Sequence, residues 1–255
     1  MKKLLFLLIL ISLFACAKNK QAKGAQPSNP SQATQLNLKD ANQLLGQKRC
    51  NQAIPLYKKF LDKEARDSGA WNLLGLAYLC NNEPQQAVTA FTRALEISPT
   101  FTDVHNNLGV AYTEMRDYTQ ARNEFLKALQ DVNYPPVAPW FNLAKLAFLQ
   151  QNYEESRALA KKVIEKSPKS AGPQLLYAIS LEHLGRVDEA AESYRTVLKT
   201  APDNMEASYY LANLLVRTHQ DCEAREYYRR VIDSDPIGEL GQKALQALKS
   251  VQCQN

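Results

Sequence analysis

Apolar and small residues recur along this chain with a period of 34 residues between about residue 36 and residue 238. Residues 68–101 show the unit most fully, at Trp71, Leu74, Gly75, Tyr78, Ala87, Phe91, Ala94 and Pro99. Most of these positions are three or four residues apart, which predicts two amphipathic helices joined by a short turn. Six such units follow one another over residues 36–238, and residues 239–255 predict one further amphipathic helix with a tail. The pattern therefore predicts an all-α protein.

The order of Leu-Gly, Tyr, Ala, aromatic, Ala and Pro within the unit resembles the tetratricopeptide (TPR) repeat. A single helix pair cannot bury its apolar faces alone, so the resemblance implies an all-α TPR solenoid. Its form would be a right-handed superhelix of about six helix-turn-helix repeats with a C-terminal capping helix. Such a stack presents a concave surface and rarely carries chemistry. We therefore expect a module that binds another protein, and not an enzyme.

Composition and charge narrow the function further. The 255-residue chain is 45% hydrophobic, which is too apolar for disorder, and its formal net charge is only +5. No stripe of Arg and Lys is interleaved with aromatic residues, so we expect no nucleic-acid binding. The sequence contains no Gly-rich phosphate loop, HExxH or nucleophile-elbow motif, and its three histidines lie in separate units. We expect no catalytic residue, metal site, cofactor or small-molecule substrate.

The N-terminus has the layout of an export signal. Lys2 and Lys3 precede an apolar run over residues 4–14, shorter than the about 20 residues that a membrane-spanning helix needs. The run leads into Leu13-Phe14-Ala15-Cys16, which resembles the bacterial lipobox. The resemblance implies that residues 1–15 are a lipoprotein signal peptide and that Cys16 carries acyl chains such as palmitate. A plain signal peptide, in which Cys16 has no role, is the alternative.

The segment after the lipobox is polar and rich in Pro, Ser, Gln and Lys. We expect residues 16–35 to form a lipidated flexible tether with a root-mean-square reach of roughly 25 Å. Cys16 is followed by Ala17, and not by the Asp that resembles an inner-membrane retention signal in Gram-negative lipoproteins. The expected location is therefore the outer membrane, on its periplasmic face, with the lipid anchor as the only membrane contact.

The other four cysteines predict two disulfides, Cys50–Cys80 and Cys222–Cys253. An exported chain meets an oxidising compartment, where an even number of thiols indicates bridges. Cys50 and Cys222 fall in predicted turns between paired helices, and their partners lie 30 and 31 residues farther along the chain. Each bridge would hold one end of the stack, where repeats have a single neighbour. Four separate buried thiols are the alternative.

The first helix of each pair is expected to line the concave surface. The candidate partner-binding residues on it combine asparagines, apolar side chains and one lysine: Asn72, Leu76, Asn106, Asn107, Val110, Phe141, Asn142, Lys145, Phe148, Leu175 and Ile179. Exposed apolar patches often mark partner sites, and an amide group both donates and accepts hydrogen bonds. The same residues could instead support the packing of the superhelix.

The third and fourth units carry a more particular pattern. It consists of His105-Asn106-Asn107-Leu108-Gly109, Gln130-Asp131 with Tyr134-Pro135, and Asn142-Leu143. This pattern resembles the type IV pilus biogenesis and stability family, the TPR lipoproteins known as secretin pilotins. The resemblance implies that the protein binds a secretin subunit and assists assembly or localisation of the secretin, the gated ring through which the pilus leaves the cell.

Three other functions stay open at this point. They are a TPR lipoprotein of a tight-adherence pilus system, an envelope scaffold for cell-wall hydrolases, and a subunit of outer-membrane protein assembly.

Overall fold

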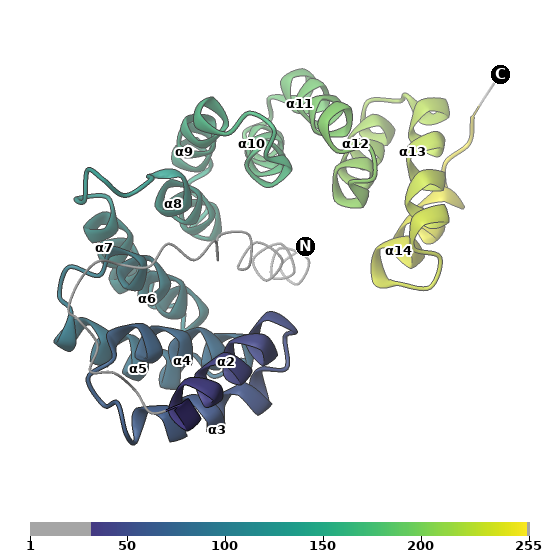
Figure 1. Cartoon of the computed structure of the whole chain (residues 1–255). Helices are drawn as coiled ribbons and strands as arrows, with labels where there is room; N and C mark the ends of the chain where they lie inside the picture. The colour runs from purple at the N-terminus through teal and green to yellow at the C-terminus, as the bar shows by residue number, and fades with distance from the viewer. Residues whose placement is uncertain (1–31, 254–255) are drawn as a thin grey trace. The chain divides into compact units, whose positions relative to one another are not determined.

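The structure, a computed structural model, describes residues 32–253, which form antiparallel helix pairs (Figure 1). The first helices of the pairs are α2 (Gln32–Gly46), α4 (Ser68–Cys80), α6 (Thr102–Glu114), α8 (Val137–Leu149), α10 (Ala171–His183) and α12 (Met205–Arg217). The second helices are α3 (Cys50–Leu61), α5 (Pro84–Ile97), α7 (Tyr118–Ala128), α9 (Tyr153–Lys166), α11 (Val187–Thr200) and α13 (Asp221–Ser234), and α14 (Glu239–Leu248) follows them. Residues 32–253 contain no strand, and the predicted all-α class is confirmed.

The predicted signal peptide and the lipidated Cys16 lie outside the described residues, as does most of the predicted tether. The boundary of the tether differs from the prediction, because α2 begins at Gln32 and residues 32–35 are therefore helical. The last proline before this helix is Pro30, and residues 32–35 contain neither Gly nor Pro to interrupt a helix.

The described residues fall into two compact units that divide after Asn142, within α8. In the first unit each helix from α2 to α7 packs against the next helix along the chain. In the second unit the same holds from α9 to α14. Each unit is thus a stack in which contacts join sequence neighbours, as expected of a repeat protein.

Residues with short polar side chains cap the N-termini of several helices. Asp67 and Asn204 precede α4 and α12, and their side chains accept hydrogen bonds from the backbone N–H groups three residues on, at 2.8 and 2.7 Å. Asp117 and Asn152 do the same for α7 and α9. A cap of this kind typically contributes ~1 kcal/mol, because it satisfies an N–H group that has no partner within the helix.

Each turn from a first to a second helix contains one residue in the left-handed conformation. These residues have φ between 58° and 74°, and only one of them is glycine: Lys48, Asn82, Arg116, Gln151, Gly185 and His219. The N–H of the residue after each one bonds back to a carbonyl of the first helix, as Glu83 does to Tyr78 at 2.9 Å. The turn geometry is therefore held by backbone hydrogen bonds and tolerates several residue types.

Close packing between paired helices depends on the small residue of the Leu-Gly or Leu-Ala position. A Cβ on Gly75 would lie 2.5 Å from the ring of Phe91, and one on Gly109 would lie 2.6 Å from the ring of Phe125. Both rings are at most 1% exposed. The glycines therefore make room for the aromatic side chain of the second helix.

Three other pairs combine alanine with a buried tyrosine, namely Ala41 with Tyr57, Ala178 with Tyr194, and Ala212 with Tyr228. Each of these tyrosine hydroxyls donates a hydrogen bond at 2.7 Å to the first helix of its own pair. The acceptors are Asn42, Glu182 and Asn213, respectively. These bonds satisfy the hydroxyl groups that burial would otherwise leave unpaired.

Two disulfides lie at the ends of the described chain and join the pairs that the sequence spacing predicts. Cys50 at the start of α3 is bonded to Cys80 at the end of α4, with their Cα atoms 5.9 Å apart. Cys222 in α13 is bonded to Cys253 beyond α14, with a Cα separation of 4.7 Å. Cys50 is buried, whereas Cys222 and Cys253 are exposed. Each bridge links one helix pair to the element that follows it.

Candidate protein-binding surface

The asparagines predicted to bind a partner instead pair with one another across neighbouring first helices. The Asn107 amide donates to Asn72 Oδ1 at 3.0 Å, which joins α6 to α4. The Asn142 amide donates to Asn106 Oδ1 at 2.9 Å, which joins α8 to α6. Within the first unit these four side chains therefore hold successive repeats together. Each amide still has further donor or acceptor capacity.

Four apolar side chains that were expected to face water are buried. Val110 and Phe148 are each 6% exposed, Leu175 is 2% exposed and Ile179 is 3% exposed. The expectation of exposure is wrong for them because a first helix packs against helices on both sides, as α10 does against α9 and α11. They stabilise the stack and present almost no surface to a partner.

The other candidate partner-binding residues are partly exposed to solvent, apart from Asn106. Half-buried side chains on the first helices are Asn72, Leu76, Asn107, Phe141, Asn142 and Lys145, whereas Asn106 is 9% exposed. Leu76 is the only aliphatic one among them, and it lies on α4 one turn after Asn72. In the first unit the accessible part of the predicted surface thus consists of amide groups around Leu76 and Phe141.

In the second unit the corresponding helices carry a charged and aromatic network that sequence analysis missed. Glu182 on α10 accepts a hydrogen bond from Arg217 on α12 at 2.6 Å and one from the Tyr194 hydroxyl at 2.7 Å. Burial, and then the charge of Glu182, raises the pKa of Tyr194 well above its ordinary value. Tyr209 and Tyr210 on α12 lie beside this network, with ring centroids 6.1 Å apart. Glu182 and Arg217 are 35 residues apart, one more than the period of 34, so the repeat pattern does not predict their contact.

A second aromatic cluster joins α8, α9 and α10. The rings of Tyr153 and His183 are stacked at 4.5 Å, and Phe148 meets both edge-on at 5.2 Å. Partial burial against these rings lowers the pKa of His183, so the neutral imidazole is favoured. Tyr153 and His183 are 30 residues apart, like Cys50 and Cys80, and they occupy the same positions in their repeats. The stack is a non-covalent counterpart of that disulfide.

His105, at the repeat position that holds Trp71 in the second repeat, forms part of a polar network. Its Nδ1 lies 2.7 Å from a carboxylate oxygen of Glu124, and Lys127 donates to the other oxygen at 2.7 Å. Glu124 is 5% exposed. Burial alone would raise the pKa of Glu124, but the hydrogen bonds from His105 and Lys127 outweigh it and the pKa is lowered. The carboxylate is therefore charged and stabilised inside the repeat.

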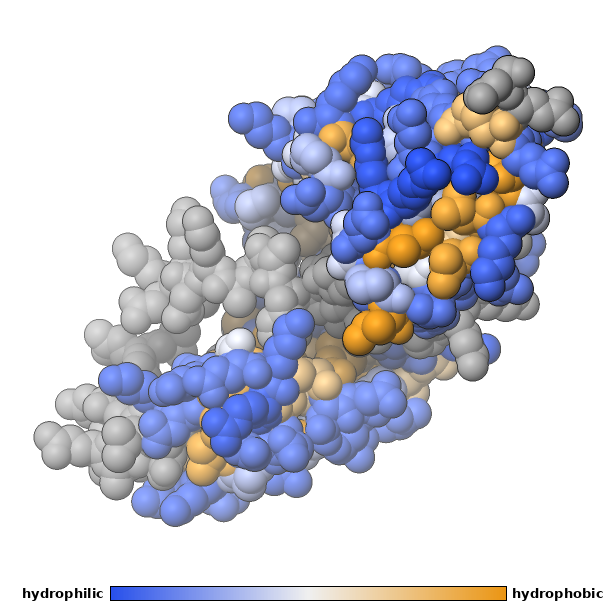
Figure 2. Space-filling model, turned by 90° about the vertical axis from the view of Figure 1, so that its right-hand side faces the viewer, coloured by the Kyte–Doolittle hydropathy of each residue, from blue (hydrophilic) through white to orange (hydrophobic). Residues whose placement is uncertain are grey.

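Hydrophilic residues cover most of the face shown in Figure 2, and apolar side chains appear between them in more than one place. The large apolar side chains that are exposed within residues 38–253 are Met115, Leu126, Val132, Ile237 and Leu245.

No cluster of three or more His, Cys, Asp or Glu side chains that could hold a metal ion occurs in the part that the structure describes. The helices described are also too short or too polar to cross a membrane.

Models of the tetratricopeptide repeat match residues 68–101, 106–171 and 176–237, and one of the models alone covers just over half of the chain. The chain belongs to the tetratricopeptide repeat family. The TPR assignment agrees with the fold, since each matched segment consists of the helix pairs described above.

Among curated TPR-containing relatives, the type IV pilus assembly protein PilF of Pseudomonas aeruginosa is 29% identical over 173 residues, which are 65% of this chain and 65% of PilF. The human protein O-mannosyl-transferase TMTC2 is 32% identical over 99 residues. That match covers 38% of this chain and 12% of TMTC2, so it supports the repeat and carries no activity to this chain. The chain spans less than two thirds of the length of either relative.

Solved structures show the same fold. PilW, described as a widely conserved type IV pilus biogenesis factor, superposes with a TM-score of 0.74 at 19% identity, covering 85% of this chain and 100% of PilW. PilF of Pseudomonas aeruginosa superposes with a TM-score of 0.70 at 19% identity, covering 84% of this chain and 97% of PilF. At these identities the structures establish the TPR architecture and not a shared partner.

Proposed function

We propose that the protein is an outer-membrane lipoprotein adaptor of type IV pilus biogenesis, which binds a secretin subunit through its first helices. The observation that carries the proposal is the similarity to PilF, which extends over 173 residues and thus over several repeats. Most other curated matches cover about a third of this chain, and two of them are human and frog mannosyl-transferases. The human protein O-mannosyl-transferase TMTC3 matches 193 residues, but at 21% identity and over only 21% of its own length, whereas the match to PilF has 29% identity and covers 65% of PilF.

The lipobox at Cys16 supports the same role. A lipidated N-terminus would fix the protein at a membrane, and a polar segment of about 15 residues would separate the lipid from the first helix. Tethering in this way raises the effective concentration of a partner in the same membrane without any added contact. A subunit that assists assembly of a membrane ring gains from this arrangement.

In the first unit the surface of α4 and α6 around Leu76, Asn72 and Asn107 is the part most suited to a protein segment. Leu76 offers apolar area, and the paired amides beside it keep hydrogen-bonding capacity that a peptide backbone can use. Val110 and Phe148 are excluded from this surface because they are buried. The binding energy would therefore come from a few half-exposed side chains.

The test uses the soluble form without residues 1–16 to capture proteins from detergent-solubilised membranes of the source cell, with identification by mass spectrometry. Recovery of a secretin is expected, and Leu76→Glu should reduce it at least tenfold. Leu126→Glu is the matched control, since Leu126 is a half-exposed leucine on the second helix α7. Thermal unfolding of both variants checks that the fold is intact.

Deletion of the gene gives an independent readout. The proposal expects loss of twitching motility and of secretin multimers in the outer membrane, with normal cell shape. Recovery of cell-wall hydrolases, together with altered cell shape and normal motility, would refute it in favour of an envelope scaffold.

A further inference from the structure

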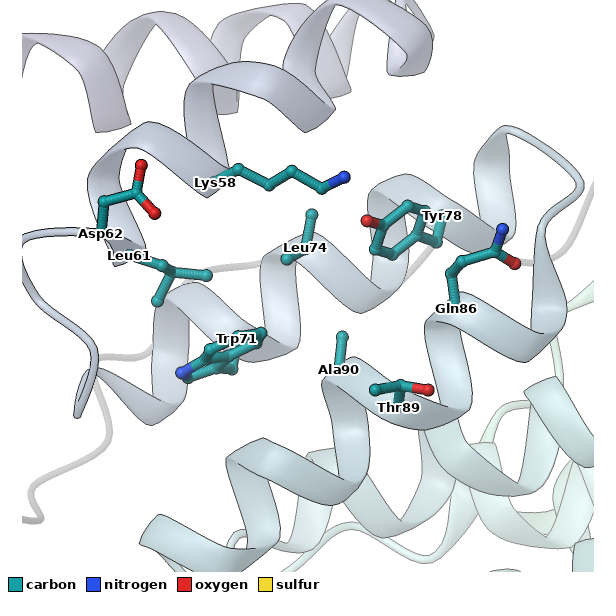
Figure 3. Close-up of a pocket in the computed structure, with 9 residues that line it drawn as sticks. All are labelled: Lys58, Leu61, Asp62, Trp71, Leu74, Tyr78, Gln86, Thr89 and Ala90. Atoms are coloured by element: carbon teal, nitrogen blue, oxygen red, sulfur yellow. The ribbon is translucent and has the colours of Figure 1, made fainter.

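A pocket of about 330 Å³ opens in the first unit between α3, α4 and α5 (Figure 3). Apolar groups form its floor, and they come from Leu61, Trp71, Leu74, Ala90 and the ring of Tyr78. Polar side chains from the end of α3 and from α5 form its rim, and they are Lys58, Asp62, Gln86 and Thr89. The pocket therefore joins an apolar base to a set of polar groups at its mouth.

Tyr78 is the unusual member of this pocket. Tyr78 is only 8% exposed, yet its hydroxyl group has no hydrogen-bond partner among the described residues. The oxygen is not sealed off, because no fully buried side-chain polar atom lacks a partner in that part of the chain. Figure 3 shows the hydroxyl directed toward the Lys58 side of the pocket. An acceptor that enters the pocket can thus pair with it.

The two ends of the pocket differ in charge. The Lys58 ammonium lies 5.6 Å from the centre of the Tyr78 ring, and the amide of Gln86 lies at the same end (Figure 3). Asp62 lies at the other end, beside Leu61. Hydrogen-bond donors therefore gather around Tyr78, and the acidic group of the rim lies away from them.

The next repeat shows what this position accommodates. Thirty-four residues after Trp71, Tyr78 and Ala90 come His105, Tyr112 and Glu124. There the chain fills the equivalent space with its own carboxylate, since Glu124 is buried and bonded to His105 at 2.7 Å. After burial, the Glu124 charge is the next cause that raises the pKa of Tyr112, which shows that the carboxylate lies close to that tyrosine. In the second repeat Ala90 has no side chain long enough to do this, and the pocket stays open.

We propose that this pocket binds the carboxylate of a Glu or Asp residue, flanked by apolar residues, from a partner protein. The carboxylate would accept hydrogen bonds from the Tyr78 hydroxyl and the Lys58 ammonium, and its apolar neighbours would pack on Leu74 and Trp71. Charge-assisted hydrogen bonds of this type are the stronger ones, because the acceptor is ionised.

The site is separate from the surface used in the proposed function. Trp71, Leu74 and Tyr78 are spaced by three and four residues on one face of α4, whereas Asn72 and Leu76 lie on another face of the helix. Failure of secretin capture and failure of this site are therefore distinguishable.

The test follows the indole N–H signal of Trp71 by NMR in the full chain, labelled at tryptophan and held in detergent. The probes are the peptides N-acetyl-Leu-Glu-Leu-amide and N-acetyl-Leu-Gln-Leu-amide. The chain has two tryptophans, so Trp140 serves as the internal control. The Glu peptide should shift the Trp71 signal and leave the Trp140 signal unchanged, and the Gln peptide should bind about tenfold more weakly.

Two variants test the donors. Tyr78→Phe removes one oxygen, and Lys58→Gln removes the charge of an exposed side chain, so both variants should fold. Each should bind the Glu peptide about tenfold more weakly than the unchanged protein. Lys59→Gln is the matched control, because Lys59 is the adjacent exposed lysine and does not line the pocket. Equal binding of the two peptides, unchanged binding by both variants, or no shift of Trp71 at about 10 mM peptide would each overturn the proposal.

Discussion

The close contact between Gly75 and Phe91 gives a quantitative test of how paired helices pack. In Gly75→Ala the new Cβ would lie 2.5, 2.6 and 2.8 Å from three ring carbons of Phe91, whereas carbon atoms in contact are normally about 3.5–4.0 Å apart. The ring is 0% exposed, so the ring and the helix that carries it must move by about 1 Å to restore a normal contact distance. Overpacking of this kind typically costs about 1–3 kcal/mol.

Alanine also favours helix formation over glycine by about 1 kcal/mol, which offsets part of that cost. The expected net loss of unfolding free energy for Gly75→Ala is therefore about 0–2 kcal/mol. Gly46→Ala is the matched control, because a Cβ added to Gly46 at the end of α2 would meet nothing within 4 Å. That variant should be neutral or slightly more stable.

Urea unfolding of both variants, followed by circular dichroism, measures the two free energies. A double-mutant cycle with Phe91→Leu separates the clash from the other effects, because a smaller side chain removes the contact with the new methyl group. The double variant should be more stable than the sum of the single effects by about 1 kcal/mol or more. Strict additivity, or a Gly75→Ala variant as stable as Gly46→Ala, would refute the packing argument.

Three further predictions concern the two disulfides and the buried carboxylate. Replacing Cys50 and Cys80 together by alanine should lower the unfolding free energy by about 3–4 kcal/mol, because the bridge closes a loop of about 30 residues. When dithiothreitol reduces the disulfides, Cys222 and Cys253 should be alkylated before Cys50, because Cys50 is buried. Mass spectrometry of samples alkylated at successive times measures this order, and simultaneous modification would contradict the prediction. The pKa of Glu124 is lowered by folding, so its contribution to stability is complete above the unfolded value of 4.5 and is lost as the pH falls through the folded value. His105→Gln should weaken that loss below pH 4.5, as measured by urea unfolding at a series of pH values, and an unchanged pH profile would exclude His105 as the cause.

The sequence predicts the helix pairs well because the positions that require a small or a large side chain recur every 34 residues. Gly75 and Gly109 stand opposite Phe91 and Phe125, and a pattern of small and large residues at fixed spacing records that contact directly. The cysteine spacing is informative for the same reason, since neighbouring repeats bring equivalent turns together.

Other features depend on contacts that the spacing does not record. Val110 on α6 and Ile179 on α10 are buried, although each of these helices also carries half-exposed residues. The sequence alone does not distinguish a hydrophobic side chain that packs against a neighbouring helix from one that faces water. The left-handed turn residues include Lys48 and Arg116, which carry no signal of that conformation. Such turns are fixed by backbone hydrogen bonds, so residue type alone does not reveal them.

The two disulfides also determine how the chain would respond to tension applied between its ends. Residues 50–80 and 222–253 are closed by covalent bonds, so each could add only the span of one bridge to the extended length instead of about 100 Å. Within residues 50–253, the residues between Cys80 and Cys222 have no such restraint and would supply nearly all of the extension. Under force the protein would therefore lengthen from its middle repeats, while the first repeat junction and the C-terminal helix stay attached to their neighbours.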